Sequence, residues 1–369
     1  MHSTKIALPD YPDALPDLIR LAAAPDNSNG ESAIPAAVLV YEDNAAGWFQ
    51  LGTTAFEVRG RPPRDLLGDV VLANRARGTG DRILRHGSCH NTLLITERCD
   101  QLCVMCSQPP KDYELDLFDA YRRALPYAAP DAIIGISGGE PLLYKSAVFT
   151  LIAEAAATRP DLGFHVLTNA QHLEDCDHGA LAALPHDRLR FAVPLYAAEA
   201  VLHDAIVGKP GAFERALEGI AMLLEAGAEV EVRTVLMQHN AAGLADLARF
   251  LAWTLPDLNH WALMQMEYIG YARRDWSTLF FDHSLDPVPI EAAVKTAEQH
   301  GLRTVLYNMP LCTLPPHLRD RAPRTISDWK QKYLPSCNAC ACRTACSGLF
   351  AWQDPVTTFD RLEPICDAS

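Results

Sequence analysis

The sequence predicts an α/β fold with a small β-containing domain before it and a cysteine-rich segment after it. From residue 91 onward, six apolar strand candidates alternate with helical patterns, and the cysteines gather in two groups at 99–106 and 337–346. Such an alternation is typical of parallel strands joined by crossover helices. The length of 369 residues and the 49% hydrophobic content suffice for a large barrel plus an appendage, or for two to three smaller domains.

The start of the chain is expected to be irregular. Residues 1–30 are rich in proline, alanine and aspartate and contain the turn-like stretch PDNSNG. The pattern then becomes strand-like at 36–41, 47–52 and 55–60, where β-branched and aromatic residues lie between turn signals. We therefore predict an irregular segment over 1–30 and a small β-containing domain over 31–88.

The strand candidates of the α/β part are mostly continuous apolar runs, as expected for parallel strands buried on both faces. They lie at 91–96, 131–137, 163–168, 188–195, 229–237 and 260–268. Two segments, 212–227 and 243–255, have apolar residues at helical spacing. These patterns place an α/β domain over 89–300 and a tail domain over 301–369. Periodicity alone leaves open whether the sheet closes, curls partway or stays open.

The first cysteine group, CDQLCVMC, has the spacing C-x3-C-x2-C directly after the first of these strand candidates. Cys99, Cys103 and Cys106 supply three thiolates, one fewer than a four-iron cluster that only transfers electrons normally takes. The open iron is then able to accept the amino and carboxylate groups of S-adenosylmethionine (SAM). A zinc site with a distant ligand, or a group of small buried side chains, is compatible with the same spacing.

A second motif, SGGEP at 137–141, ends the next strand candidate, in the same place relative to its strand as the cysteine loop. Gly138 and Gly139 permit a close backbone approach, and Glu140 is able to accept a hydrogen bond from a ligand ammonium group. A GGE sequence alone is more often an ordinary turn. Its pairing with the cysteine loop favours a ligand site.

Together, CDQLCVMC, SGGEP and the strand–helix series resemble the radical SAM superfamily from about Asn91 to Tyr271. The resemblance implies a partial (β/α)6 barrel in which reductive cleavage of SAM gives methionine and a 5′-deoxyadenosyl radical, which abstracts hydrogen from an unreactive carbon. It implies a SAM-binding [4Fe-4S] cluster on the three cysteines and places Met105 near the adenine. The methionine moiety is expected at Gly138, Gly139 and Glu140.

Three further polar residues belong to later strand candidates. Asn169 and Tyr196 follow their strands, and Arg233 lies within one, so all three are candidates for the barrel mouth. Asn169 and Arg233 are expected to contact the ribose or carboxylate of SAM through polar and charge-assisted bonds. A purely structural role explains these residues equally well: they would then cap a turn or lie as solvated or core-edge side chains.

The second cysteine group lies in CNACACRTAC, where Cys337, Cys340 and Cys346 form C-x2-C-x5-C. Cys312 is the best candidate for a distant fourth ligand, and Cys342 is the alternative. Four thiolates suit zinc or a fully ligated cluster. The order of cysteines resembles the auxiliary-cluster domains called twitch and SPASM, which follow radical SAM cores that modify peptides and some small molecules. It implies a second, auxiliary [4Fe-4S] cluster.

The remaining bulk features exclude several classes of partner. The formal charge of −14 argues against broad nucleic-acid binding. The first residues lack the pattern of a signal peptide, and no eighteen-residue apolar run follows, so we expect a cytoplasmic protein without membrane contact. Eleven cysteines in a reducing compartment point to metal rather than disulfides. Cys89 and Cys176 are expected to be small buried residues, and Cys366 is a further candidate ligand.

More narrowly, NTLLITERCDQLCVMCSQPPKD resembles the His-Xaa-Ser system radical SAM maturase of the C type, with support from FEVRGRPPRDLLGDVVLAN upstream. This resemblance implies post-translational modification of a ribosomally made peptide with His-Xaa-Ser repeats. It also implies a second radical SAM maturase as partner and an electron donor such as flavodoxin or ferredoxin. A radical SAM enzyme acting on a small molecule and a non-catalytic iron–sulfur or zinc protein are the alternatives.

Overall fold

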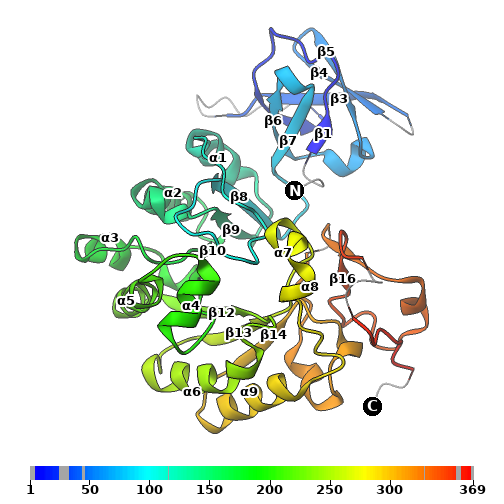
Figure 1. Ribbon diagram of the computed structural model, residues 1–369. Helices are drawn as coiled ribbons and strands as arrows, with labels where there is room; N and C mark the ends of the chain where they lie inside the picture. The colour runs from blue at the N-terminus through cyan, green and yellow to red at the C-terminus, as the bar shows by residue number, and fades with distance from the viewer. Residues whose placement is uncertain are drawn as a thin grey trace. The chain divides into compact units, whose positions relative to one another are not determined.

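The structure, a computed structural model, describes residues 5–24, 33–43, 46–114, 116–327, 329–354 and 359–366. Within these residues the strands form a closed barrel, a seven-stranded sheet and a two-stranded sheet (Figure 1). The chain divides into two compact units, and each is described by itself. The first comprises Met1–Ile95, Leu115–Ser137 and Ser146–His165. The second comprises Thr96–Glu114, Gly138–Lys145 and Val166–Ser369.

The first unit begins with a closed β-barrel in the order β1-β5-β4-β3-β2-β6-β7. Its strands are Lys5–Ala7 (β1), Leu18–Ala22 (β2), Ala36–Glu42 (β3), Ala46–Leu51 (β4), Thr54–Arg59 (β5), Val70–Asn74 (β6) and Thr79–Leu84 (β7). Strands β2 and β3 pair in parallel, and the other neighbours pair antiparallel. Closure of the sheet leaves few unpaired backbone groups at its edges.

Apolar side chains fill the interior of this barrel. Phe49 and Phe56 face each other from β4 and β5, with their ring centroids 6.3 Å apart, and Ile19 and Leu21 of β2 are fully buried. The strands predicted in this region coincide with β3, β4 and β5. The prediction of an irregular start is wrong for β1 and β2, because both are barrel strands whose short runs, KIA and LIRLA, lie among prolines that suggest turns.

The seven-stranded sheet has the order β14-β13-β12-β11-β10-β9-β8, which is the order of the chain, and it is open at both ends. Its strands are His90–Thr96 (β8), Ile133–Gly138 (β9), Gly163–Leu167 (β10), Leu189–Pro194 (β11), Glu229–Val235 (β12), His260–Met264 (β13) and Thr304–Tyr307 (β14). Strands β11 to β14 pair in parallel. All six predicted strands are confirmed, and β14 is an additional seventh strand.

Helices alternate with these strands. They are Phe118–Ala124 (α1), Lys145–Thr158 (α2), His178–Ala182 (α3), Ala200–Val207 (α4), Ala212–Glu225 (α5), Leu244–Thr254 (α6), Gly270–Arg274 (α7), Trp276–Leu279 (α8) and Val288–Gln299 (α9). Helices α5 and α6 confirm the two predicted helices, and α6 packs beside α9 (Figure 1). In the described part of the chain, every helix is too short or too polar to cross a membrane.

The tail of the second unit has little regular structure. Strands Gln331–Lys332 (β15) and Leu349–Phe350 (β16) pair antiparallel. Between them and before them, short 3-10 turns span Pro335–Ala339 and Leu311–Thr313. The first of these turns contains Cys337 and the second contains Cys312, two of the predicted tail ligands.

Candidate active site in the second unit

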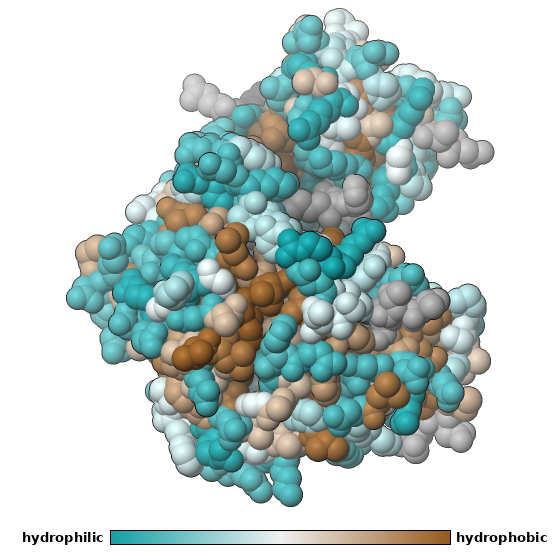
Figure 2. Space-filling model, in the orientation of Figure 1, coloured by the Kyte–Doolittle hydropathy of each residue, from teal (hydrophilic) through white to brown (hydrophobic). Residues whose placement is uncertain are grey.

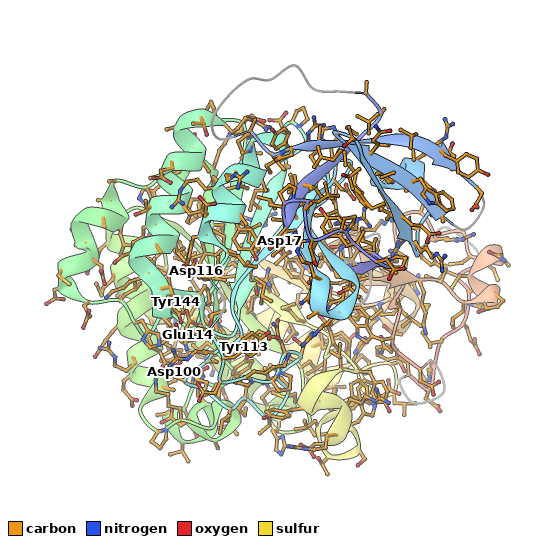
Figure 3. All side chains as sticks on the ribbon, turned by 90° about the horizontal axis from the view of Figure 1, so that it is seen from above. Asp17, Asp100, Tyr113, Glu114, Asp116 and Tyr144 are labelled. Atoms are coloured by element: carbon orange, nitrogen blue, oxygen red, sulfur yellow. The ribbon has the colours of Figure 1, made fainter. Side chains whose placement is uncertain are left out.

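The three predicted cluster cysteines lie in the loop that follows β8. Hydrogen bonds from Leu102 N to Val207 O and from Val104 N to Ile206 O, both 2.9 Å long, tie this loop to the end of α4. The following segment is held by Glu97, which is buried and accepts hydrogen bonds from Lys111 Nζ (2.6 Å) and from the Tyr113 hydroxyl. Tyr113 and Asp100 are labelled in Figure 3. The backbone around the cysteines is therefore fixed by the protein itself.

The thiols of this loop lie close enough to influence one another. Burial raises the pKa of Cys99 to about 12, and the charges of Glu140, Asp100 and Cys106 act in the same direction. Burial also raises the pKa of Cys103, and Cys106 and Cys99 add to this effect. Three adjacent thiolates are stable when a metal centre supplies positive charge, since coordinating thiols are deprotonated. The residues therefore fit a metal cluster.

The two glycines of the second motif lie against the backbone of the cysteine loop. A Cβ on Gly138 would lie 2.2 Å from Thr96 O, and one on Gly139 would lie 2.0 Å from Arg98 O. The backbones are joined by hydrogen bonds of 2.8 Å from Gly139 N to Thr96 O and from Glu140 N to Arg98 O. The close approach expected of these glycines thus joins β9 to the cysteine loop. Their contact with a methionine moiety stays a prediction.

Replacing Gly139 with alanine is expected to lower the free energy of unfolding by about 1–3 kcal/mol, because the added methyl group meets a backbone carbonyl that is unable to move aside cheaply. Urea unfolding followed by circular dichroism measures the change. Gly179→Ala is the matched control, since its Cβ would meet nothing within 4 Å. It lies in α3, where alanine adds up to about 1 kcal/mol of stability. Equal stability of the two variants would contradict the packing argument.

Glu140 connects the ends of β9 and β10. It is 1% exposed and accepts hydrogen bonds from Leu142 N (2.8 Å), the Thr168 hydroxyl (2.5 Å) and Asn169 N (2.6 Å). Burial raises the pKa of Glu140 to about 7, against the lowering effect of these three donors. Both oxygens have protein partners, so this carboxyl group organises the site whether or not it also contacts a ligand.

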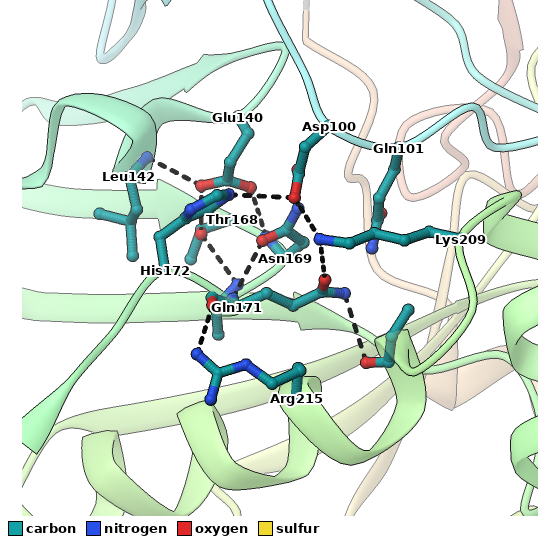
Figure 4. Close-up of polar contacts among 12 residues, drawn as sticks. Asp100, Gln101, Glu140, Leu142, Thr168, Asn169, Gln171, His172, Lys209 and Arg215 are labelled. Carbon is teal, nitrogen blue, oxygen red and sulfur yellow. Dashed lines mark hydrogen bonds and ion pairs between the residues drawn. The ribbon is translucent and has the colours of Figure 1, made fainter.

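Asp100, between the first two cysteines, is the centre of a polar network (Figure 4). Its carboxylate accepts hydrogen bonds from Asn169 Nδ2 (3.0 Å) and Lys209 Nζ, and His172 Nε2 lies 3.2 Å away. Burial tends to raise the pKa of Asp100, but His172 and Lys209 outweigh it and hold that pKa well below its usual range. The network fastens the cysteine loop to the segment after β10 and to the residues after α4.

Sequence reasoning missed Asp100, His172 and Lys209 and predicted only Asn169 among the members of this network. The one available signal was an acidic residue inside a cysteine motif. Asn169 is 4% exposed, and its Oδ1 accepts a hydrogen bond of 3.0 Å from Gln171 N. Because its amide nitrogen binds Asp100, the observed role of Asn169 is to position the loop. Its predicted contact with SAM stays a prediction.

Arg233 lies on β12 beside a buried acidic residue. It forms an ion pair with Glu231, which is fully buried and also lies 3.3 Å from His260 Nε2. The Tyr307 hydroxyl lies 3.0 Å from that same nitrogen. Burial raises the pKa of Tyr196, and the charges of nearby Cys103 and Arg233 also act on it. Arg233 therefore lies within electrostatic range of Tyr196, which packs in the same apolar cluster as Met105 of the cysteine loop.

Met105, predicted near the adenine, is 7% exposed and belongs to an apolar cluster. The cluster also contains Tyr196, Met237 and Met266, and Cys103 packs against it. Figure 2 shows an apolar band on the surface beside α4. An apolar wall next to the thiols suits a flat aromatic ligand and excludes water from the cysteine loop.

The tail cysteines line a pocket that opens partly to solvent. Its lining includes all four predicted ligands, Cys312, Cys337, Cys340 and Cys346. The sulfur of Cys346 accepts hydrogen bonds from Leu311 N (3.4 Å) and Gly348 N (3.3 Å). Burial raises the pKa of Cys312 to about 12, and Cys346, Cys337 and Cys340 raise it further. Four thiols that line one pocket supply the number of ligands that a four-thiolate metal centre takes.

The alternative ligand, Cys342, is not among the residues that line this pocket. Cys366 is exposed, and its thiol lies 3.7 Å from Pro364 O, whose residue belongs to the lining. The expectation that Cys89 and Cys176 are buried is wrong, since both are exposed. Each lies in a short connection between regular elements, where little apolar surface is available to cover a thiol.

Fold and site together define an α/β protein with an open parallel sheet and a three-thiol loop after the first strand of that sheet. Residues 93–251 match the family model described as the Radical SAM superfamily. An AdoMet-dependent heme synthase of Nitratidesulfovibrio vulgaris is 27% identical over 176 residues, 46% of this chain and 47% of that protein. One of Oleidesulfovibrio alaskensis is 25% identical over 158 residues, 42% of this chain and 39% of that protein.

These matches therefore span less than half the length of the curated relatives. Among solved structures, SuiB of Streptococcus suis bound to precursor peptide SuiA has a TM-score of 0.50 and 14% identity, over 60% of this chain and 49% of that chain. SuiB bound to S-adenosylmethionine has a TM-score of 0.50 and 15% identity, over 60% of this chain and 51% of that chain. At this level of identity, the likeness shows a shared fold.

Proposed function

We propose that the chain is a radical SAM enzyme that cleaves SAM reductively and modifies a ribosomally made peptide with His-Xaa-Ser repeats. The observation that carries this proposal is the pair of cysteine sites in one compact unit, with three thiols in the loop after β8 and four in the tail pocket. Three ligands suit a cluster with one iron open to SAM, and four suit a fully ligated auxiliary cluster.

The residues of the chain have two roles in this proposal. Cys99, Cys103 and Cys106 would hold the [4Fe-4S] cluster, which together with SAM supplies the chemistry of the 5′-deoxyadenosyl radical. Gly139 and Asp100 keep the cysteine loop in place through backbone packing and the polar network. A flavodoxin or ferredoxin as electron donor and a second maturase as partner belong to the same proposal.

The substrate is either a peptide or a small molecule. The precursor peptide bound in SuiB makes a peptide the first substrate to test, and the order of the tail cysteines supports it. A small molecule is the second candidate, because the curated relatives at 27% and 25% identity are named for heme synthesis.

Anaerobic reconstitution of the full chain with iron, sulfide, SAM and dithionite tests the proposal. We expect about eight irons per chain and release of 5′-deoxyadenosine. Adding a synthetic peptide of His-Ala-Ser repeats should change the mass of that peptide only when SAM and reductant are both present. Consumption of a porphyrin instead would favour the small-molecule alternative. Absence of 5′-deoxyadenosine under all these conditions would refute the proposed enzyme.

A further inference from the structure

Two polar side chains at the carboxyl end of β13 lack partners in the described part of the chain. Gln265 is 2% exposed, and neither atom of its side-chain amide has a hydrogen-bond partner there. Glu267 is half-buried, and no described side chain forms a hydrogen bond or ion pair with its carboxylate. Buried polar groups are nearly always hydrogen-bonded, so the unpaired amide of Gln265 requires an explanation.

Both side chains emerge on the same side of the strand end. Gln265 N donates a hydrogen bond of 3.0 Å to Tyr307 O, so sheet pairing continues to this residue. Met266 packs into the apolar cluster that contains Met105. If the alternation of β13 continues past Met264, Gln265 and Glu267 lie on the side opposite Met266. The charge of Lys330 acts on Glu267, which places the tail of the chain on that side.

Chain neighbours of this position contact both cysteine sites. Tyr271 N donates a hydrogen bond of 2.9 Å to Cys106 O, and a Cβ on Gly270 would lie 2.2 Å from the same oxygen. On the other side, Lys330 precedes Gln331, whose Nε2 donates to Ser347 O (2.6 Å) beside Cys346. Glu267 therefore lies four residues from Tyr271, which is hydrogen-bonded to Cys106, and Lys330, whose charge acts on Glu267, adjoins a residue bonded next to Cys346.

The local charges leave Glu267 able to bind a cation. Burial raises the pKa of Glu267, and Lys330 opposes that effect. The Lys330 ammonium lies 4.9 Å from the centre of the Trp329 ring and 5.9 Å from that of Trp352, so aromatic rings hold it without a direct ion pair to Glu267. A hydrogen bond between this carboxylate and a cationic side chain would be charge-assisted and therefore stronger than one between neutral groups. The Gln265 amide offers one donor group and one acceptor, which complements a peptide bond.

We propose that Gln265 and Glu267 bind the peptide substrate, with Glu267 contacting a basic side chain and Gln265 the backbone next to it. This inference rests on the proposed peptide substrate and specifies which feature of it the chain recognises. The ligand class is a segment with a histidine, lysine or arginine side chain. Lys330 is a competing cation, so its removal is expected to strengthen the interaction.

The test uses the full reconstituted chain and two fluorescein-labelled probes, a peptide of His-Ala-Ser repeats and a peptide of Gln-Ala-Ser repeats. Fluorescence anisotropy at pH 6, where free histidine is mostly protonated, gives both dissociation constants. We expect the wild type to prefer the histidine probe by about tenfold, corresponding to one carboxylate contact of about 1.4 kcal/mol. Glu267→Gln should abolish that preference, and Lys330→Met should increase it.

Glu214→Gln is the matched control, because Glu214 is exposed on α5 and should leave the preference unchanged. Lys330→Met also keeps the test decisive if Glu267→Gln fails to fold. The inference is overturned if the wild type binds both probes equally, or if Glu267→Gln retains the preference. Parallel measurement of 5′-deoxyadenosine separates the two claims, since a wild type that cleaves SAM without a Glu267-dependent preference refutes only this inference.

Discussion

Replacing Cys103 with serine is expected to abolish 5′-deoxyadenosine formation and to remove about four irons per chain. Serine keeps the size of the side chain but removes one of three thiols in a loop that the backbone already holds, so the effect falls on the metal rather than on the fold. Cys106 N still donates its 3.0 Å hydrogen bond to the carbonyl of residue 103. Iron analysis and chromatography of the reaction mixture after anaerobic reconstitution measure both losses.

Cys176→Ser is the control for this experiment. Cys176 is exposed and lies in a 3-10 turn away from the three-thiol loop in the sequence, so its variant should match the wild type in iron content and SAM cleavage. A Cys103→Ser protein with normal iron would show that the loop is not the cluster site. Unchanged biological function of the same variant would favour the non-catalytic alternative.

The sheet was predictable because buried parallel strands are continuous apolar runs, which need no knowledge of distant residues. Runs such as NTLLIT match β8 for this reason. The same reasoning fails for β14, where TVLY has only four residues, and for β1, which has three. Strands this short show neither alternation nor a long apolar run, and pairing with neighbours determines them. The sequence therefore predicted the fold class, but it indicated only three of the seven strands of the β-barrel.

In the candidate site too, features that depend on neighbouring residues were predictable, and contacts between distant residues were not. The spacing of Cys99, Cys103 and Cys106 is local, so the motif was visible in the sequence. Lys209 and Asp100 are 109 residues apart in the chain, and only folding brings them together. The close approach predicted for the glycines is observed against the protein backbone, and their contact with a ligand stays a prediction. The backbone neighbours are the carbonyl of Thr96 for Gly138 and that of Arg98 for Gly139, and no sequence pattern identifies them.

The choice between Cys312 and Cys342 as fourth ligand was open in the sequence, because both spacings are compatible with four-thiolate sites. The pocket favours Cys312, which lines it together with Cys337, Cys340 and Cys346. The turn that contains Cys312 is joined to Cys346 by the hydrogen bond from Leu311 N to the Cys346 sulfur. Removal of Cys312 should therefore disrupt the tail site and leave the three-thiol loop intact.

Cys312→Ala is expected to lower the iron content from about eight to about four per chain, whereas Cys342→Ala should retain about eight. Electron paramagnetic resonance of the reduced proteins distinguishes the sites, because only the signal of the three-thiol cluster should respond to SAM. The reverse pattern, with iron lost in Cys342→Ala, would assign Cys342 as the ligand. Stoichiometric zinc in the wild type that disappears in Cys312→Ala would keep the four-thiol geometry but replace the auxiliary cluster with a structural metal, since zinc binds the same four thiolates.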